Sequence, residues 1–154
     1  MKDIKMVDLD GQYLKIKNEI DGAILDVISS SKFINGPNVK EFCENLSKYL
    51  KCKHTVPCAN GTDALQIALM ALGVGPGDEV ITPSFSYIAT AEATALLGAK
   101  PVYVDVDPVT FNINHSLIED RITKRTKAII PVSLYGQPAD FDEINAIALK
   151  YNLP

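Results

Sequence analysis

The chain has 154 residues, a length that suits one ordinary domain. Hydrophobic residues make up 47% of it and charged residues 22%, which excludes a disordered or collagen-like protein. The formal charge of −4 and the lack of a basic stripe argue against a protein that binds a nucleic-acid backbone. No uninterrupted run of about 18 apolar residues occurs, so we expect no membrane partner and no spanning helix.

The cysteines favour a reducing compartment. There are three, Cys43, Cys52 and Cys58, and the first residues of the chain lack the apolar core of a secretory signal peptide. We therefore expect a cytoplasmic protein. Cys52 and Cys58 flank His54, a spacing that suggests a metal, but zinc sites usually take four such ligands. The only other histidine is His115, so a metal site is disfavoured.

The order of the expected elements predicts an α/β protein. A helix over about 12–31 has apolar side chains on one side, and a second helical stripe follows Pro37. We then expect strands at 54–58, 79–82, 100–106 and 128–134, and helices at 63–72, 87–97, 115–122 and from Asp140, where Glu143 completes a capping box. Apolar strands that alternate with helices predict a mostly parallel sheet with helices on both faces. No linker is evident, so we expect residues 1–154 to belong to a single domain.

The first candidate ligand site is the turn Asn60–Asp63, which joins an expected strand to the next helix. In open α/β sheets, ligands bind beyond the carboxyl ends of the strands. Thr62 can act as the cap of the helix and offer a hydroxyl, and the N–H groups of Thr62, Asp63 and Ala64 would point at an anion such as a phosphate. The alternative is a capped helix without a ligand, because threonine is a common capping residue. The turn matches neither the dinucleotide-binding motif nor the P-loop.

The second candidate segment, residues 82–90, leaves a strand and enters a helix. Tyr87 or Phe85 could lie flat on a planar ligand ring there, and the alternative is an aromatic that closes the core. Asp105 and Asp107 follow the next strand and could be acid or base groups, but we favour hydrogen bonding within a turn. No Ser/His/Asp set is evident, and no lysine stands at the carboxyl end of an expected strand.

Six motifs, in this order, resemble the amino-terminal part of the DegT/StrS family of nucleotide-sugar aminotransferases. They are 33–37 (FINGP), 60–65 (NGTDAL), 75–83 (GPGDEVITP), 87–91 (YIATA), 104–107 (VDVD) and 131–140 (PVSLYGQPAD). The resemblance implies the amino-terminal part of the large domain of the aspartate-aminotransferase fold, the fold of the type I enzymes that use pyridoxal 5'-phosphate (PLP). It also implies a homodimer with active sites at the subunit interface.

The resemblance assigns residues to the cofactor. Gly61, Thr62 and Asp63 match the turn that holds the cofactor phosphate, and Tyr87 matches the aromatic residue that stacks on the pyridine ring. Ser133 stands where many members have histidine, which puts a substrate role there in doubt.

No catalytic residue is expected in this chain. In the family, the aspartate at the pyridine nitrogen comes on the next strand and the Schiff-base lysine comes later, so both are expected beyond Pro154. The aspartate keeps the ring protonated, and the lysine binds the cofactor and moves a proton. The sequence stops directly after a helix pattern, so we expect a fragment that is inactive alone.

The resemblance implies a function for the parent protein. We expect it to transfer an amino group from an amino acid such as glutamate to a nucleotide-linked keto sugar, within polysaccharide biosynthesis. One alternative is a sugar dehydratase of the same family that depends on pyridoxamine phosphate. Another is a non-catalytic module that binds a phosphate or only dimerises.

Overall fold

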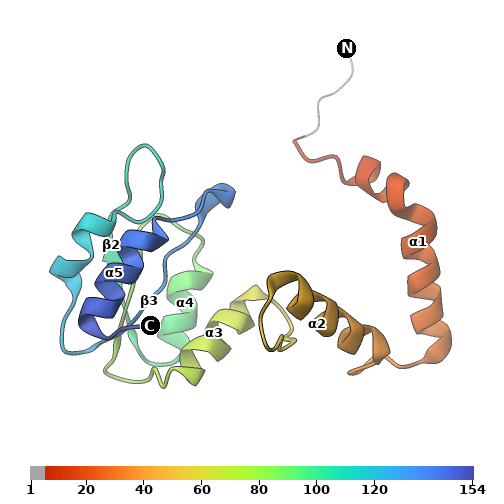
Figure 1. Ribbon diagram of the computed structural model, residues 1–154, viewed down its shortest axis with the longest axis horizontal. Coiled ribbons are helices and arrows are strands. Elements are labelled where there is room, and N and C mark those ends of the chain that lie inside the picture. Colours follow the sequence, from red (N-terminus) through yellow and green to blue (C-terminus); the bar gives the residue numbers. More distant parts are fainter. Residues whose placement is uncertain (1–5) are drawn as a thin grey trace, which may run out of the picture. The chain divides into compact units, whose positions relative to one another are not determined.

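The computed structural model describes residues 6–154, which form two compact units, one up to Pro57 and the other Cys58–Pro154. We call them the amino-terminal unit and the sheet unit. The amino-terminal unit contains helices α1 (Leu9–Ser30) and α2 (Pro37–Leu50) (Figure 1). Whether the chain forms a single domain stays a prediction.

Helix α1 begins three residues earlier than the predicted 12–31, because Asp8 caps it. The Asp8 carboxylate accepts a hydrogen bond from the Gly11 amide at 3.0 Å. The helix ends before Ser31, whose backbone is left-handed. Helix α2 begins with Pro37 at its first position, where the missing N–H of proline costs nothing. Neither helix has a buried residue, so the apolar stripe of α1 is exposed in this chain.

The sheet unit is a parallel α/β structure, as predicted. Its elements are α3 (Gly61–Ala71), β1 (Glu79–Pro83), α4 (Ala89–Leu96), β2 (Lys100–Val104), β3 (Thr126–Ile129) and α5 (Phe141–Tyr151). The strands pair in the order β2-β1-β3, and both pairings are parallel. Because every strand points the same way, the loops that follow the three strands meet at one edge of the sheet.

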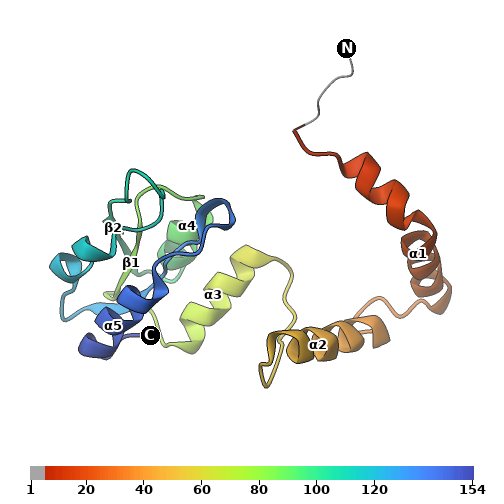
Figure 2. The same cartoon turned by 45° about the horizontal axis from the view of Figure 1, so that its top comes forward.

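The central strand β1 is buried at all five positions and sends alternate side chains to the two faces. Val80 packs into a cluster with Leu69 of α3 and Ala93 of α4. Ile81 packs on the other face with Ile144 of α5. Helices therefore cover both faces of the sheet, with α3 and α4 on one side and α5 on the other (Figure 2).

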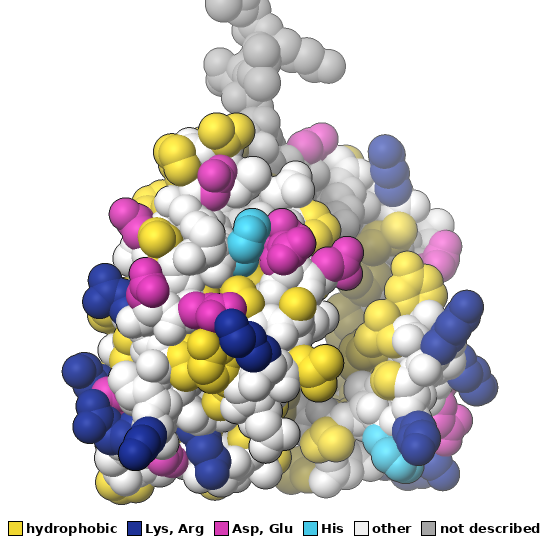
Figure 3. Space-filling model, turned by 60° about the vertical axis from the view of Figure 1, so that its left-hand side comes forward, with side chains coloured by type: hydrophobic (Ala, Val, Ile, Leu, Met, Phe, Trp, Pro, Cys, Tyr) yellow, Lys and Arg dark blue, Asp and Glu magenta, His cyan; other side chains and the backbone are white. Residues whose placement is uncertain are grey.

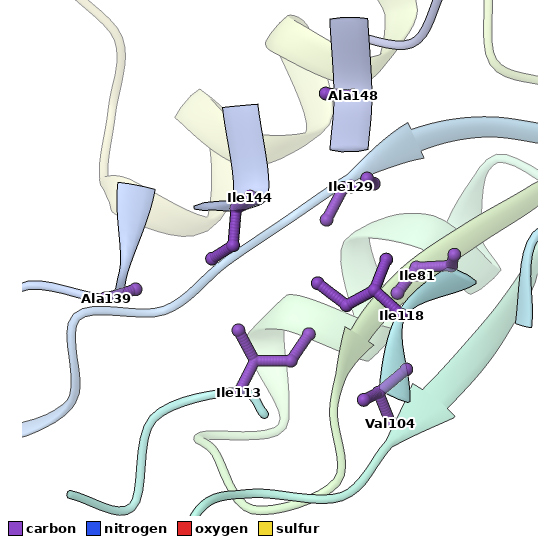
Figure 4. Close-up of a cluster of buried hydrophobic side chains, with 8 residues drawn as sticks. All are labelled: Ile81, Val104, Ile113, Ile118, Ile129, Ala139, Ile144 and Ala148. Atoms are coloured by element: carbon purple, nitrogen blue, oxygen red, sulfur yellow. The ribbon is translucent and has the colours of Figure 1, made fainter. Parts of the chain in front are cut away.

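The cluster on the α5 face includes Ile118, which comes from the segment between β2 and β3. Figure 4 shows Ile118 in the middle of the cluster, among Ile113, Ile129 and Ile81. Its side chain is fully buried. The loop between β2 and β3 is thus fixed to the sheet by apolar contacts.

Two predicted elements differ from the structure. Residues 54–58 are not a strand: they pair with no strand among residues 6–154, and Val56 is 75% exposed. Apolar β-branched residues favour an extended backbone, but a strand exists only with a neighbour in the ladder. Residues 115–122 are two short 3-10 turns, His115–Leu117 and Glu119–Arg121, rather than one helix.

Two predicted strands are shorter than expected. The strand predicted at 100–106 ends at Val104, where the chain turns into the loop that contains Asp105. The strand predicted at 128–134 ends at Ile129, although the Ile130 amide still donates to the Ile81 carbonyl at 2.8 Å. Pro131 then follows, and its missing N–H cannot continue the ladder.

The edge of the sheet opposite the loops contains an ion pair between the buried Glu79 and the exposed Arg125. Glu79 of β1 accepts hydrogen bonds from the Thr123 hydroxyl at 2.6 Å and from Arg125 Nη2 at 2.7 Å. The Thr123 hydrogen bond, followed by Arg125, holds the pKa of the Glu79 carboxyl below its ordinary value. This pair joins the start of β1 to the segment that enters β3.

Within residues 6–154, none of the helices has the length and apolarity needed to cross a bilayer.

Candidate functional site

The start of α3 is capped by Asn60, and the prediction that Thr62 is the cap is wrong. The Asn60 side-chain oxygen accepts a hydrogen bond from the Asp63 amide at 2.9 Å. The Asn60 backbone is extended, with φ −163° and ψ 176°, whereas Thr62 already lies within the helix. A capping residue needs a non-helical backbone, so Asn60 alone can take this role.

The cap decides which amides remain available for a ligand. The Asp63 N–H is bound to the Asn60 side chain, and the Ala64 N–H donates to the Asn60 carbonyl at 3.1 Å. The N–H groups of Gly61 and Thr62 have no hydrogen-bond partner within residues 6–154. Two unpaired amides at the positive end of a helix form an arrangement that suits a phosphate.

Asp63 contributes to the cap from its side chain as well. Its carboxylate accepts a hydrogen bond from the side-chain nitrogen Nδ2 of Asn60 at 3.2 Å. Asn60 and Asp63 therefore hold each other, which keeps the first turn of α3 in place. The assignment of Gly61, Thr62 and Asp63 to a cofactor phosphate stays a prediction.

Tyr87 lies on the loop that leaves the carboxyl end of β1. Its carbonyl accepts the Thr90 amide at 3.2 Å as the chain turns into α4. The side chain is 77% exposed, so Tyr87 does not close the core. Phe85 is half exposed, and its ring lies 5.8 Å from the ring of Phe111. Of the two aromatic candidates, Tyr87 is therefore the one with a ring face free for a ligand.

The two aspartates after β2 serve the turn, as favoured from the sequence. Asp105 accepts hydrogen bonds from the Val106 amide at 2.8 Å and the Ser84 hydroxyl at 3.3 Å. Asp107 accepts from the amides of Val109 and Thr110 at 2.9 and 2.8 Å. These backbone hydrogen bonds, that of Thr110 first, lower the pKa of the Asp107 carboxyl.

Asn112 is a buried polar residue that the sequence reasoning missed. Its side-chain nitrogen donates to the carbonyls of Gln137 and Pro138 at 3.1 and 3.0 Å. Its side-chain oxygen accepts from the Leu134 amide at 3.0 Å. Asn112 thus ties the loop after β2 to the loop after β3. No local pattern marks it, because its partners are 22 to 26 residues away.

His115 has a partner that the sequence pattern did not reveal. Its Nδ1 lies 3.5 Å from a carboxylate oxygen of Asp140. Figure 3 shows one face of the molecule, on which acidic and basic side chains are both exposed. The predicted capping box is therefore wrong, because the Asp140 side chain makes no cap hydrogen bond to α5. The nearby Ser116 hydroxyl donates to the Asn114 side chain at 2.7 Å.

The fold and the site define a class of protein. In this parallel α/β structure, the helix before the first strand begins with unpaired amides, and the loop after that strand has an exposed aromatic ring. Amides at a helix start suit a phosphate, and an exposed ring suits a planar ligand. Residues 14–154 match the model of the DegT/DnrJ/EryC1/StrS aminotransferase family, and the chain belongs to this family.

Characterised relatives align along nearly the whole chain. The chain is 60% identical over 151 residues to UDP-2-acetamido-2-deoxy-3-oxo-D-glucuronate aminotransferase of Pseudomonas aeruginosa, covering 98% of this chain and 42% of that protein. It is 47% identical over 150 residues to the UDP-N-acetyl-3-dehydro-alpha-D-glucosamine 3-aminotransferase of Acidithiobacillus ferrooxidans, covering 97% of this chain and 41% of that protein. The chain thus spans about two fifths of the length of these relatives.

Solved structures confirm the predicted fold. S. venezuelae DesV, in complex with a ketimine intermediate, superposes with a TM-score of 0.96 at 39% identity, over 99% of this chain and 41% of that one. NtdA of Bacillus subtilis, with bound PMP, superposes with a TM-score of 0.87 at 42% identity, over 90% of this chain and 32% of that one. The chain has the amino-terminal part of the type I PLP fold.

Pyridoxal phosphate is the cofactor of this family, and the residues at the start of α3 fit its phosphate. The unpaired amides of Gly61 and Thr62 can donate to phosphate oxygens, and a Cβ added at Gly61 would meet nothing within 4 Å. An exposed tyrosine ring, that of Tyr87, is the type of group that lies against a pyridine ring.

Proposed function

We propose that the protein containing this chain transfers an amino group from an amino acid such as glutamate to a nucleotide-linked keto sugar, with PLP as cofactor. The observation that carries the proposal is the 60% identity over 151 residues with an aminotransferase that is named for a UDP-linked 3-oxo sugar acid. Because the chain spans 42% of that relative, the proposal concerns the whole protein.

The relatives also support a substrate class. The two relatives described above, at 60% and 47% identity, are both named for UDP-linked sugars with a 3-oxo or 3-dehydro group. We therefore propose a UDP-linked 3-oxo sugar as the amino acceptor. This proposal is narrower than the nucleotide-linked keto sugar expected from the sequence.

The residues of this chain take binding roles in the proposal. The Gly61 and Thr62 amides donate to the cofactor phosphate, Asp63 keeps that turn in place through Asn60, and Tyr87 lies against the pyridine ring. The cofactor, when bound, supplies the electron sink for amino transfer. The lysine and the aspartate that complete this chemistry stay a prediction for the part of the protein beyond Pro154. The inactivity of the 154 residues alone also stays a prediction.

The assembly and cellular role are proposals as well. We propose a homodimer whose active sites lie at the subunit interface, located in the cytoplasm and serving polysaccharide biosynthesis. The resemblance to the family motifs supports the homodimer, and the sugar substrates in the relatives' names support a role in making sugar polymers.

Product analysis with the complete protein tests the function. The protein is incubated with PLP, glutamate and a UDP-linked 3-oxo-2-acetamido sugar, and the products are identified by mass spectrometry. We expect an amino sugar and 2-oxoglutarate in equal amounts. A deoxygenated sugar without added nitrogen would identify the dehydratase instead. If no product forms with any amino donor, the non-catalytic module is the remaining hypothesis. The 154-residue chain alone serves as a control that should form no amino sugar.

A further inference from the structure

A crevice beside Tyr87 has no role in the proposed binding of the cofactor. It has a volume of about 260 Å³ and lies between the loop after β1, the first turn of α4 and strand β2. Among residues 6–154, no charged side chain lines it. Six hydroxyl-bearing side chains do, four of them aliphatic and two aromatic, namely Thr82, Ser84, Ser86, Thr90, Tyr87 and Tyr103.

Thr82 makes this crevice unusual within the fold. Its side chain is completely buried, and its hydroxyl is the only buried side-chain polar atom in the described residues without a hydrogen-bond partner. Buried hydroxyls are nearly always paired, because an unpaired one has lost its water without compensation. An isosteric valine would avoid this cost, so the hydroxyl calls for an explanation outside the contacts of the chain.

The neighbouring groups define what could pair with Thr82. Tyr103 is the direct partner of Thr82 in the parallel ladder, so both side chains project to the α4 face. The Ser86 and Thr90 hydroxyls lie 3.4 Å apart and bond to each other, which leaves each with capacity for another bond. The crevice therefore combines hydroxyl donors and acceptors with aromatic walls and no charge.

We infer that this crevice is a binding subsite for the sugar ring of the substrate, with a sugar hydroxyl or amide group as the partner of Thr82. A sugar ring is uncharged, has hydroxyls at its edge and has apolar C–H faces that lie against aromatic rings. A sugar ring therefore matches the crevice better than a phosphate or a carboxylate does. An anion would need a cationic side chain, and none of the described residues that line the crevice is cationic. Tyr87 would then contact the cofactor and also border the sugar. The inference rests on the proposed function.

Calorimetric titration of the complete protein tests the inference. The probes are UDP-N-acetylglucosamine and UDP. The difference between their affinities reports the contribution of the sugar. We expect Thr82→Val to weaken binding of UDP-N-acetylglucosamine about five- to tenfold, the loss of one hydrogen bond, without changing the affinity for UDP. Thr82→Ser keeps the hydroxyl and should bind within about twofold of the wild type.

Thr94→Val is the matched control. Thr94 is equally buried, but its hydroxyl donates to the Thr90 carbonyl within α4 and lies outside the crevice lining. This variant should bind both probes like the wild type. Thr82→Val should fold at least as stably as the wild type, because it removes an unpaired buried hydroxyl.

Three results would overturn the inference. They are equal affinity of the wild-type protein for both probes, no effect of Thr82→Val, or an equal effect on UDP. A Thr82→Val variant that changes the oligomeric state and not the sugar affinity would instead place a second copy of the chain over the crevice, and would also overturn it. PLP binding and amino transfer are measured separately, so sugar binding without either would refute only the proposed function.

Discussion

Replacing Gly61 by proline removes one of the two unpaired amides at the start of α3 and leaves the helix able to form. Proline suits the first position of a helix, and the extended backbone of Asn60 is the conformation that a residue before proline prefers. Gly61→Pro therefore deletes a donor without deleting the cap. Gly61→Ala is the matched control, since it keeps the amide and its Cβ meets nothing within 4 Å.

The expected loss follows from one hydrogen bond to a charged group. Such a bond contributes about 1.5–3 kcal/mol, and each 1.4 kcal/mol is about a factor of ten in affinity. Gly61→Pro should thus weaken PLP binding by about 10- to 150-fold, leaving Thr62 as the remaining amide donor. Gly61→Ala should bind PLP within a few-fold of the wild-type protein.

The assay compares PLP with pyridoxal, which lacks the phosphate. The complete protein and each variant are titrated with both compounds by absorbance, and thermal unfolding is followed in parallel to show that α3 still forms. The loss should appear with PLP and not with pyridoxal. An unchanged affinity for PLP, or an equal loss with both compounds, would show that the Gly61 amide does not bind the phosphate.

Three further predictions concern stability. Ile118→Ala should lower the free energy of unfolding, measured in urea, by about 2–5 kcal/mol. The matched control is Leu117→Ala at a partly exposed position, which should lower it by less than about 1 kcal/mol. Equal losses in the two variants would show that Ile118 is not central to the core. Asn112→Ala should cost roughly 2 kcal/mol or more, because it leaves two carbonyls and an amide unpaired, and a smaller loss by the same measurement would mean that water replaces it. For Glu79, whose folded pKa is lowered, the stabilisation by the carboxylate is present above its unfolded pKa and is lost as the pH falls through its folded pKa. The stability difference between the wild-type chain and Glu79→Gln should therefore shrink below about pH 4.3, and a constant difference would contradict the ion-pair reasoning.

The sequence predicted the elements whose signals are local. The helical periodicity before Leu50 and the start of that helix at Pro37 both agree with α2. The apolar runs at β1, β2 and β3 were recognised together with their parallel pairing. Tyr87 and the Asn60–Asp63 turn were singled out because the carboxyl ends of strands and the starts of helices have fixed chemical properties that a few residues reveal.

The errors arose where the partner of a residue is distant in sequence. Asp140 looked like the start of a capping box, but its carboxylate lies beside His115, 25 positions earlier. Residues 54–58 looked like a strand, but a strand needs a neighbour that local sequence cannot supply. The cap of α3 is a local exception: Thr62 was predicted, but the extended backbone of Asn60 makes Asn60 the capping residue.

The parallel strands, most of the helices and the family could be predicted from the sequence, because each depends on side chains within about ten residues of one another. Only the tertiary structure decided which amides of the Asn60–Asp63 turn are unpaired, how Asn112 joins two loops and where Thr82 is left without a partner. Hydrogen bonds are directional and short, so whether a polar group is paired depends on the positions of residues that the folded chain brings together.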